Sequence, residues 1–354
     1  MTTTLTQARR DLAGALGGYQ KVTQGVQYTM PTGTYLGIST AADAARLIIT
    51  SDLVDLNYAG DGSDTDSNWN NGAFAYLLNT VPEQRRLSNG SYSPSNAASD
   101  LVNITTTGFY AASLEMARPM GTAVTAGTVV ELHSMLPPLD WDRGEGLHKC
   151  INRALMAMPM EYSVSITGAG TKIISLGSTI PWLYRKDQYI GCYDKAADSD
   201  SLGRPHPGIN PEHPFEFSGN TVSLVSDYVF PSGDTFTLKL WRPVGTWIKT
   251  GGTWGDSTVG LVNETDECFA DPKIVELCAT YYAYKTLAKV HRGVGQGAYY
   301  AEQLPEVAAL AAPYLRFDND LHPEERTTGI GYANGYPVIG FPGDYAGSGG
   351  GSWP

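Results

Sequence analysis

The sequence predicts an α+β protein whose helical N- and C-terminal elements pack together with a large β-rich middle region, built as a sandwich or a barrel. Three observations predict this class. An amphipathic helical pattern opens the chain, a longer one begins at Pro272, and the region between holds short runs rich in Val, Thr, Tyr and Phe, separated by Gly and Pro. Hydrophobic residues make up 42% of the 354 residues, so a large core can form.

We expect three regions along the chain. Residues 1–60 and 263–326 form a helical core, and residues 61–262 form a β-rich domain with one internal helix near residues 145–158. Residues 327–354 form a C-terminal arm rich in glycine and aromatic residues. We find no repeat of solenoid or propeller type.

The first helix has a clear start and end. Thr4 can cap its N-terminus, and the glycine pair at 17–18 stops it. A short amphipathic helix at a terminus needs a partner that covers its apolar stripe. Either the chain's own C-terminal helix or a neighbouring subunit covers it. The candidate partner-binding residues for the second alternative are Leu5, Leu12 and Leu16.

The middle of the chain alternates between strand-like runs and turn residues. Residues 21–38 predict a hairpin, residues 40–53 predict a second helix, and Pro159 closes a third helix that starts near Gly146. The clearest strand candidates are Ala73–Leu78, Leu101–Thr107, Phe109–Leu114, Thr128–His133, Tyr162–Ile166, Thr171–Leu176, Thr221–Val229 and Thr235–Trp241.

The strongest local pattern is the helix after residue 271. Asp271 supplies an N-cap and Pro272 the first helical position, and Gly293 ends the helix. A further helix is expected at about 300–315. The apolar positions of the first of these helices recur at spacings of three and four: Ile274, Leu277, Cys278, Tyr281, Tyr284, Leu287 and Val290.

The C-terminal region 327–354 contains nine glycines and cannot build a core of its own. One alternative is disorder. The other is an arm that orders on the surface of a partner, with aromatic side chains as anchors. The candidate partner-binding residues of this arm are Tyr332, Tyr336, Phe341, Tyr345 and Trp353.

The charge balance argues against a nucleic-acid-binding protein. The chain carries 36 acidic and 24 basic residues, for a formal net charge of −12, so contact with phosphates gains little from counterion release. An acidic wall would keep passing DNA from sticking, although solubility alone also explains the charge. No signal peptide and no apolar run long enough to span a bilayer is visible, so we expect no membrane partner.

Residues that could bind a metal or a cofactor do not form a recognised pattern. The four cysteines contain no C-x-x-C pair, and Cys278 fits a helix core as a small hydrophobe. The region Asp61–Asn68 starts like a calcium loop but lacks the required glycine and glutamate. His206 and His213 fall in a proline-rich loop expected to be exposed. We therefore expect no cofactor and no metal, and the one alternative left open is a weak, noncanonical cation site at Asp61–Asn68.

Catalytic motifs are also absent from the sequence. Asp140, Asp142 and Glu145 surround Trp141, which invites comparison with glycoside hydrolases, but acidic residues ahead of a helix more often stabilise its N-terminus. No Walker A motif, G-x-S-x-G elbow or activated cysteine is present. We therefore expect a protein that is not an enzyme.

The order of elements resembles the adaptor, connector or neck proteins at the head-to-tail junction of tailed bacteriophages. Four segments carry the resemblance: the opening helix Thr4–Ala13, the β-rich segment Val130–Pro138, the helix Gly146–Leu155 and the helix Asp271–Tyr284. The two β-rich stretches depart from the small, all-helical adaptors of this family.

The resemblance implies a structural protein of the virion, assembled in the cytoplasm of the bacterial host. It implies a homo-oligomeric ring, usually a dodecamer, that binds the portal protein and tail or collar proteins. The genome would pass through the ring without specific nucleic-acid binding. The 21 Tyr and 7 Trp suit such interfaces, which favour aromatic side chains.

Two alternatives remain open. The chain could be another phage structural protein of the collar, tail or fibre, in which Trp182, Trp241, Trp247 and Trp254 bind a glycan. It could also be a glycan-hydrolysing enzyme of the virion that uses Asp140 and Asp142.

Overall fold

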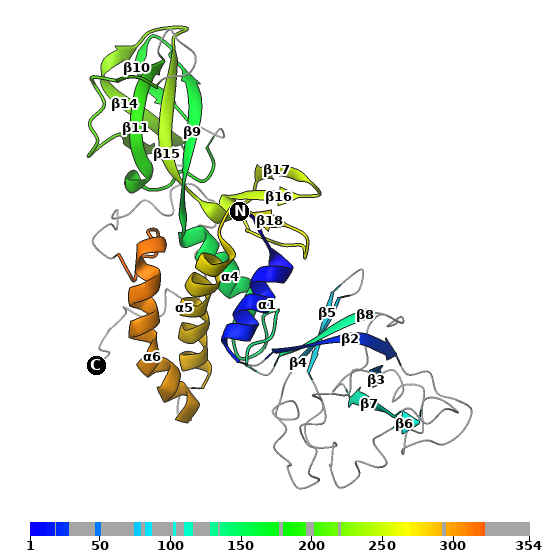
Figure 1. Ribbon diagram of the computed structural model, residues 1–354. Helices are drawn as coiled ribbons and strands as arrows, with labels where there is room; N and C mark the ends of the chain where they lie inside the picture. The colour runs from blue at the N-terminus through cyan, green and yellow to red at the C-terminus, as the bar shows by residue number, and fades with distance from the viewer. Residues whose placement is uncertain are drawn as a thin grey trace, which may run out of the picture. The chain divides into compact units, whose positions relative to one another are not determined.

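The computed structural model describes residues 1–17, 19–27, 47–50, 74–78, 82–86, 102–103, 110–115, 128–133, 135–176, 180–195, 202–218, 221–291 and 295–322 (Figure 1). Its helices and antiparallel strands confirm the predicted α+β class, with helices near both ends of the chain. The α-helices are α1 (Leu5–Ala15), α4 (Leu147–Ala157), α5 (Pro272–Val290) and α6 (Gly295–Ala311).

The chain folds into two compact units. Unit 1 consists of Met1–Leu5, Asn152–Ile274 and the described residues from Ala308 onward. Unit 2 consists of Thr6–Ile151 and Val275–Val307. This division differs from the predicted regions, which separate a helical core from one β-rich domain. Each unit instead combines its own sheets with helical segments, because strands on either side of α4 join different sheets.

Unit 2 is built on a sheet with the strand order β5-β4-β8-β2-β3-β7-β6. The predicted helix at 40–53 is wrong where the structure describes it, because Leu47–Thr50 forms strand β3. Two β-branched isoleucines fill the middle of β3, which pairs antiparallel with both β2 and β7. The bounds are β2 Tyr19–Gln27, β3 Leu47–Thr50, β4 Phe74–Leu78, β5 Glu83–Arg86, β6 Val102–Asn103, β7 Tyr110–Glu115 and β8 Thr128–His133.

The helical segments of unit 2 are linked by direct side-chain contacts. Arg9 of α1 lies 3.2 Å from His148 of α4, and Cys150 of α4 lies 3.9 Å from Thr286 of α5 in a buried contact. The rings of Tyr284 on α5 and Tyr300 on α6 meet at 5.3 Å. The N- and C-terminal helices therefore share one packed region, as predicted.

Local signals place α5 correctly. The Lys273 N–H donates to Asp271 Oδ1 at 2.9 Å, so Asp271 caps the helix as expected. Cys278 is fully buried on this helix, and all four cysteines are free and buried. The helix α6 ends at Ala311, before the predicted residue 315, and a 3₁₀ turn over Ala312–Tyr314 follows.

A two-layered sandwich forms the larger part of unit 1 (Figure 1). Its sheets have the orders β12-β11-β15-β9 and β10-β14-β13, and the described strands do not close into a barrel. Apolar side chains from both sheets, among them Leu224 and Leu238, form one core. The bounds are β9 Pro159–Thr167, β10 Thr171–Ser175, β11 Tyr189–Lys195, β12 Leu202–Pro205, β13 Phe215–Ser218, β14 Thr221–Phe230 and β15 Thr235–Pro243.

A smaller sheet in unit 1 brings the N-terminal residues of the chain together with residues 247–268. Its order is β1-β18-β16-β17, and β1 pairs with β18 through Thr3 opposite Cys268. The bounds are β1 Thr3–Thr4, β16 Trp247–Thr250, β17 Thr253–Asp256 and β18 Glu267–Cys268. Short 3₁₀ turns η4 (Lys186–Gln188) and η5 (Val244–Thr246) also belong to unit 1.

Candidate protein-contact surface

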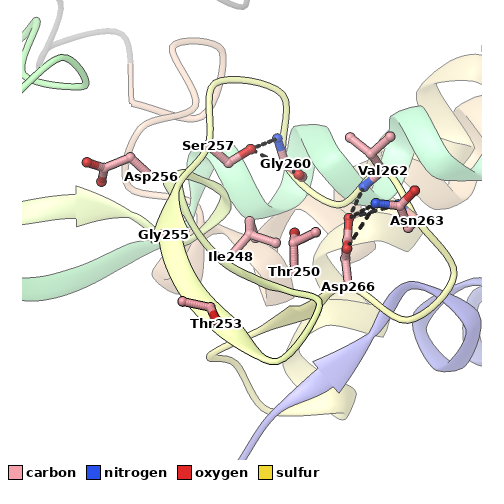
Figure 2. A pocket seen from close by; sticks show the side chains of 10 residues that line it. All are labelled: Ile248, Thr250, Thr253, Gly255, Asp256, Ser257, Gly260, Val262, Asn263 and Asp266. Carbon is pink, nitrogen blue, oxygen red and sulfur yellow. Dashed lines mark hydrogen bonds between the residues drawn. The ribbon is translucent and has the colours of Figure 1, made fainter.

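The small sheet of unit 1 and the loop 257–266 enclose an open pocket of about 340 Å³ (Figure 2). The strands β16 and β17 form one wall, and the loop that leads to β18 forms the other. Apolar, hydroxyl and carboxylate side chains all contribute to its lining. The lining residues are Ile248, Thr250, Thr253, Gly255, Asp256, Ser257, Gly260, Val262, Asn263 and Asp266.

The buried carboxylate of Asp266 holds this loop in place. Asp266 Oδ2 accepts hydrogen bonds from the backbone N–H groups of Val262 at 2.9 Å and Asn263 at 2.8 Å (Figure 2). Burial opposes ionisation of the carboxyl, but the hydrogen bonds from Asn263 and Val262 outweigh it and hold the pKa of Asp266 below its usual value. The charge therefore serves to organise the loop.

Hydrogen bonds from α4 also fix this loop. The Asn152 side chain bonds both backbone groups of Leu261, each at 2.9 Å, in the way a neighbouring strand would. Gly260 lies beside these hydrogen bonds with φ +79°, a conformation that favours glycine. A Cβ at Gly260 would collide with the Asn152 side chain, 2.7 Å from its Cγ. The sequence Gly260-Leu261 thus fits the loop tightly against α4.

The organised loop and the end of the sheet expose large apolar side chains. Val259 and Val262 are 57% and 60% exposed, and Phe269 is 55% exposed. Scattered apolar residues are normal on a protein surface, but Val259 and Val262 lie on the hydrogen-bonded loop and Phe269 directly follows β18. A fixed loop loses little conformational entropy on binding, so apolar groups on it are suited to hold a protein partner.

A row of stacked side chains supports the exposed Phe269 from inside. The Arg242 guanidinium lies 4.6 Å from the ring centre of Trp247, which stacks with Trp254 at 6.3 Å. Trp254 in turn meets Phe269 edge-on at 6.4 Å. Arg242 is fully buried and pairs with Asp256. The row is therefore anchored at its buried end by an ion pair and by cation–π contacts.

The side chains that line the pocket offer both polar and apolar contacts. Both carboxylates of the pocket are engaged, Asp256 by Arg242 and Asp266 by its own loop. The hydroxyl of Thr250 also bonds to Asp266, so the hydroxyl of Thr253 and the apolar side chain of Val262 remain as lining groups. Such a mixture offers hydrogen bonds and apolar contact to a main chain or to small side chains.

A second cluster of charged side chains lies in unit 2, where Arg9 and Glu131 are fully buried and Arg10 is partly exposed. Glu131 on β8 accepts hydrogen bonds from Arg9 Nε at 2.8 Å and Arg10 Nε at 2.6 Å. Burial opposes the charge of Glu131, but its contact with His133 at 3.6 Å and its hydrogen bonds from the arginines outweigh burial and lower its pKa well below the usual range. Burial also lowers the pKa of His133. This cluster joins α1 to β8.

The sequence did not single out this cluster or the exposed loop. Arg9 and Arg10 stand out as a basic pair, and Glu131 and His133 share one face of β8 because residues two apart in a strand point the same way. A charged pair in an otherwise apolar strand was therefore the available signal. Val259 and Val262 carry no comparable signal, since nothing local marks a valine as exposed.

The structure describes only some of the residues that we predicted to bind a partner. Leu5 and Leu12 have no exposed surface and Leu16 is half-buried, so residues of the same chain cover the stripe of α1. The burial leaves no surface for a partner at Leu5 and Leu12. The residues predicted for the arm lie outside the described part of the chain: Tyr332, Tyr336, Phe341, Tyr345 and Trp353.

The acidic residues near Trp141 act on the start of α4. Asp140 Oδ1 accepts a hydrogen bond from the Gly146 N–H at 2.8 Å, and Glu145 pairs with Lys149 at 3.2 Å. Asp140 is also 3.7 Å from Lys149. These contacts fit the expectation that the cluster stabilises the N-terminal end of the helix.

The candidate metal ligands are not gathered in the described parts of the chain. No group of three or more His, Cys, Asp or Glu side chains is placed there to hold a metal ion. His206 is buried, with its ring 4.7 Å from that of Phe230, so the expectation of an exposed loop is wrong at this residue. The Asp61–Asn68 loop lies outside the described residues.

The four central tryptophans do not form an open row for a sugar. Trp182 is buried in the sandwich core, and Trp241 lies under Arg316, whose guanidinium is 5.3 Å from the ring centre. Trp247 lies between Arg242 and Trp254. Protein groups therefore already occupy most of the ring faces that a glycan would need.

Comparison of the chain with known protein families, with curated proteins and with solved structures finds no match. In the described ranges, no helix is both long enough and apolar enough to cross a membrane.

Proposed function

We propose that the chain is a structural protein of the virion that forms a ring at the head-to-tail junction of a tailed bacteriophage. In this role it bridges the portal protein and components of the tail or collar. The ring is a homo-oligomer, with twelve copies implied by the family that the sequence resembles. It assembles in the cytoplasm of the bacterial host and requires no cofactor.

The observation that carries the proposal is the apolar surface of the loop 257–266 and of Phe269. Its side chains are exposed in one copy, and the loop beneath them is held rigid by Asp266 and Asn152. Ring subunits meet through two different surfaces, so each copy must expose a patch that a neighbour covers. Aromatic and aliphatic side chains with few charges suit the centre of such an interface.

The composition supports the same role. Charged residues make up only 17% of the chain, below the roughly 25% of typical soluble domains. The net charge of −12 disfavours adhesion to DNA, which in this role passes through the ring. The order of helices and β-rich segments resembles that of neck proteins, and this resemblance is what points to the head-to-tail junction rather than to another part of the virion.

Mass photometry and negative-stain microscopy of the purified chain test this function. We expect rings, or binding to the portal ring of the same phage. Strictly monomeric protein at high concentration, with no binding to the portal, would overturn the proposal.

A pair of matched variants tests the surface itself. Replacing both Val262 and Phe269 with serine removes apolar contact worth about 1.5–3 kcal/mol for each side chain that becomes buried. We expect ring formation to fall at least tenfold. Ile173→Ser on β10 is the control, because Ile173 is also half-exposed but lies outside this surface. Equal effects of both changes would argue against the assigned surface.

The glycan-binding alternative for a collar, tail or fibre protein receives less support. It depends on tryptophan faces that are open to solvent, whereas Trp182 is buried and the ring of Trp247 contacts both Arg242 and Trp254.

A further inference from the structure

Strand β9 forms one edge of the sandwich sheet β12-β11-β15-β9. It runs over nine residues, Pro159–Thr167, and pairs with β15 at every position without a shift of register. On its other side, no strand of the described chain is paired with it. β9 therefore presents a long and regular backbone edge.

Two hydrogen bonds at its ends determine which backbone groups face this edge. The Val244 N–H donates to Met158 O at 2.9 Å, and the Gly168 N–H donates to Asp234 O at 2.8 Å. Hydrogen-bonded positions alternate along an antiparallel pair, so the even-numbered residues of β9 bond to β15. The N–H and C=O groups that point to the free edge belong to Glu161, Ser163, Ser165 and Thr167.

The other edges of the sandwich carry features that discourage pairing. β12 ends in Pro205 and its pairing with β11 shifts register, and β10 has a register shift and carries Lys172. β13 has only four residues. Natural sheets protect their edges with short strands, bulges, proline and lysine. β9 has its only proline at the first position and no lysine, so this edge is the unprotected one in the described sandwich.

We propose that β9 pairs with β9 of a second copy of this chain, antiparallel about a twofold axis at Val164. This register joins the two sandwich sheets edge to edge and overlaps the strands almost completely. It places Ser163 opposite Ser165 of the second copy and Glu161 opposite Thr167 of the second copy. The backbone groups at the free edge then bond to each other, because all four residues occupy positions of the same phase.

The side chains of β9 fit this register on both faces of the sheet. On the outer face, no like charges meet, because the single acidic residue Glu161 lies opposite a threonine. On the inner face, Val164 meets Val164 of the second copy, and Tyr162 meets Ile166 of the second copy. Tyr162 and Val164 are only partly buried in one copy, so pairing covers apolar surface that the sandwich leaves open.

The contact is twofold, so it is distinct from the head-to-tail contacts of a ring and does not depend on the proposed function. An edge-to-edge contact buries less area than the roughly 1,200 Å² of a stable interface, so we expect weak, concentration-dependent pairing. In a ring-forming protein it would join copies from two rings. In any other assembly it would join copies in pairs.

Cysteine cross-linking of the full chain tests the register. At the twofold axis, the Cα atoms of the two Val164 residues would be about 4.5 Å apart, within the range that a disulfide spans. Val164→Cys should therefore form a covalent dimer under mild oxidation. Thr167→Cys is the matched control, because its two copies would lie roughly 20 Å apart. The wild-type chain, whose four cysteines are buried, gives the background.

A proline tests whether the free edge makes the contact. Ser163→Pro removes an N–H that faces the edge and leaves the pairing with β15 intact, so the variant should fold. In the Val164→Cys background it should slow cross-linking about tenfold or more. Amide hydrogen exchange of the wild-type chain gives an independent test. The exchange of Ser163 and Ser165 should slow as protein concentration rises, while the exchange of Val164 stays constant.

Dimers of Val164→Cys but not of Thr167→Cys support the proposal. No dimer of either variant, equal dimer formation by both, or exchange rates independent of concentration would overturn it. Ring formation by the wild-type chain is read separately by mass photometry, so failure of the ring and failure of β9 pairing are distinguishable.

Discussion

Arg9 on α1 donates a hydrogen bond of 2.8 Å to Glu131 on β8, and neither side chain has any exposed surface. The two residues lie 122 positions apart in the chain. Arg10 reaches the same carboxylate from the partly exposed side. The first helix is thus attached to the sheet of unit 2 by a buried charge cluster as well as by its apolar stripe.

Removing the carboxylate should therefore destabilise unit 2 strongly. Glu131→Ala removes the carboxylate that pairs with the buried guanidinium of Arg9, and breaking a buried ion pair in this way costs about 3–5 kcal/mol. Chemical denaturation measures the loss. Arg10→Met is the control and should cost less, because Arg10 is 31% exposed and keeps access to water. A smaller loss for Glu131→Ala than for Arg10→Met would contradict the assigned role.

Acid should destabilise the protein through His133. Burial lowers the pKa of His133 below its ordinary value of 6.5. The charge of Arg9 lowers this pKa further, and Glu131 raises it but does not cancel the effect of burial. The unfolded chain therefore binds a proton as the pH falls below about 6.5, while the folded chain does not, and stability falls by up to about 1.4 kcal/mol per pH unit.

His133→Gln should flatten this dependence. We expect the difference in unfolding free energy between pH 7 and pH 5 to be larger in the wild-type chain than in the variant. His206, whose pKa burial also lowers, contributes with the same sign in both proteins and cancels in the comparison. Parallel pH profiles of the two proteins would refute a buried, neutral His133.

Alanine substitutions at Gly260 and Gly251 distinguish the cost of backbone strain from the cost of a steric collision. Both have positive φ, +79° and +59°, so alanine costs about 1 kcal/mol or more at either position. A Cβ at Gly260 also collides with Asn152, whereas a Cβ at Gly251 meets nothing within 4 Å. We expect Gly260→Ala to lower the melting temperature more than Gly251→Ala and to weaken ring assembly, because it displaces the loop that carries Val262.

Deletion of residues 327–354 should leave the fold intact and weaken assembly. This region cannot form a core of its own, so the isolated subunit should keep its melting temperature. Analytical ultracentrifugation of the truncated and full chains gives the change in assembly. A large fall in the melting temperature of the subunit would show that the region belongs to the fold rather than to an arm.

Local patterns predicted the elements that depend on neighbouring residues. The Asp271-Pro272 cap placed the start of α5, and the alternation in Thr235–Trp241 predicted most of β15, which extends to Pro243. The same reasoning failed at residues 47–50, where a pattern compatible with a helix forms a strand. A run of leucine and isoleucine suits either element, and pairing with β2 and β7 decides between them.

The sequence by itself determined the α+β class, the N-cap of α5 and the strands β9, β10, β14 and β15 of unit 1, because these depend on periodicity and on chemistry within a few residues. Only the tertiary structure decided the division into two units, the burial of Glu131 against Arg9, and the exposure of Val259, Val262 and Phe269. These features depend on which distant segments meet, and no local pattern encodes that choice. The free edge of β9 belongs to the same class, since a strand is an edge only relative to the strands beside it.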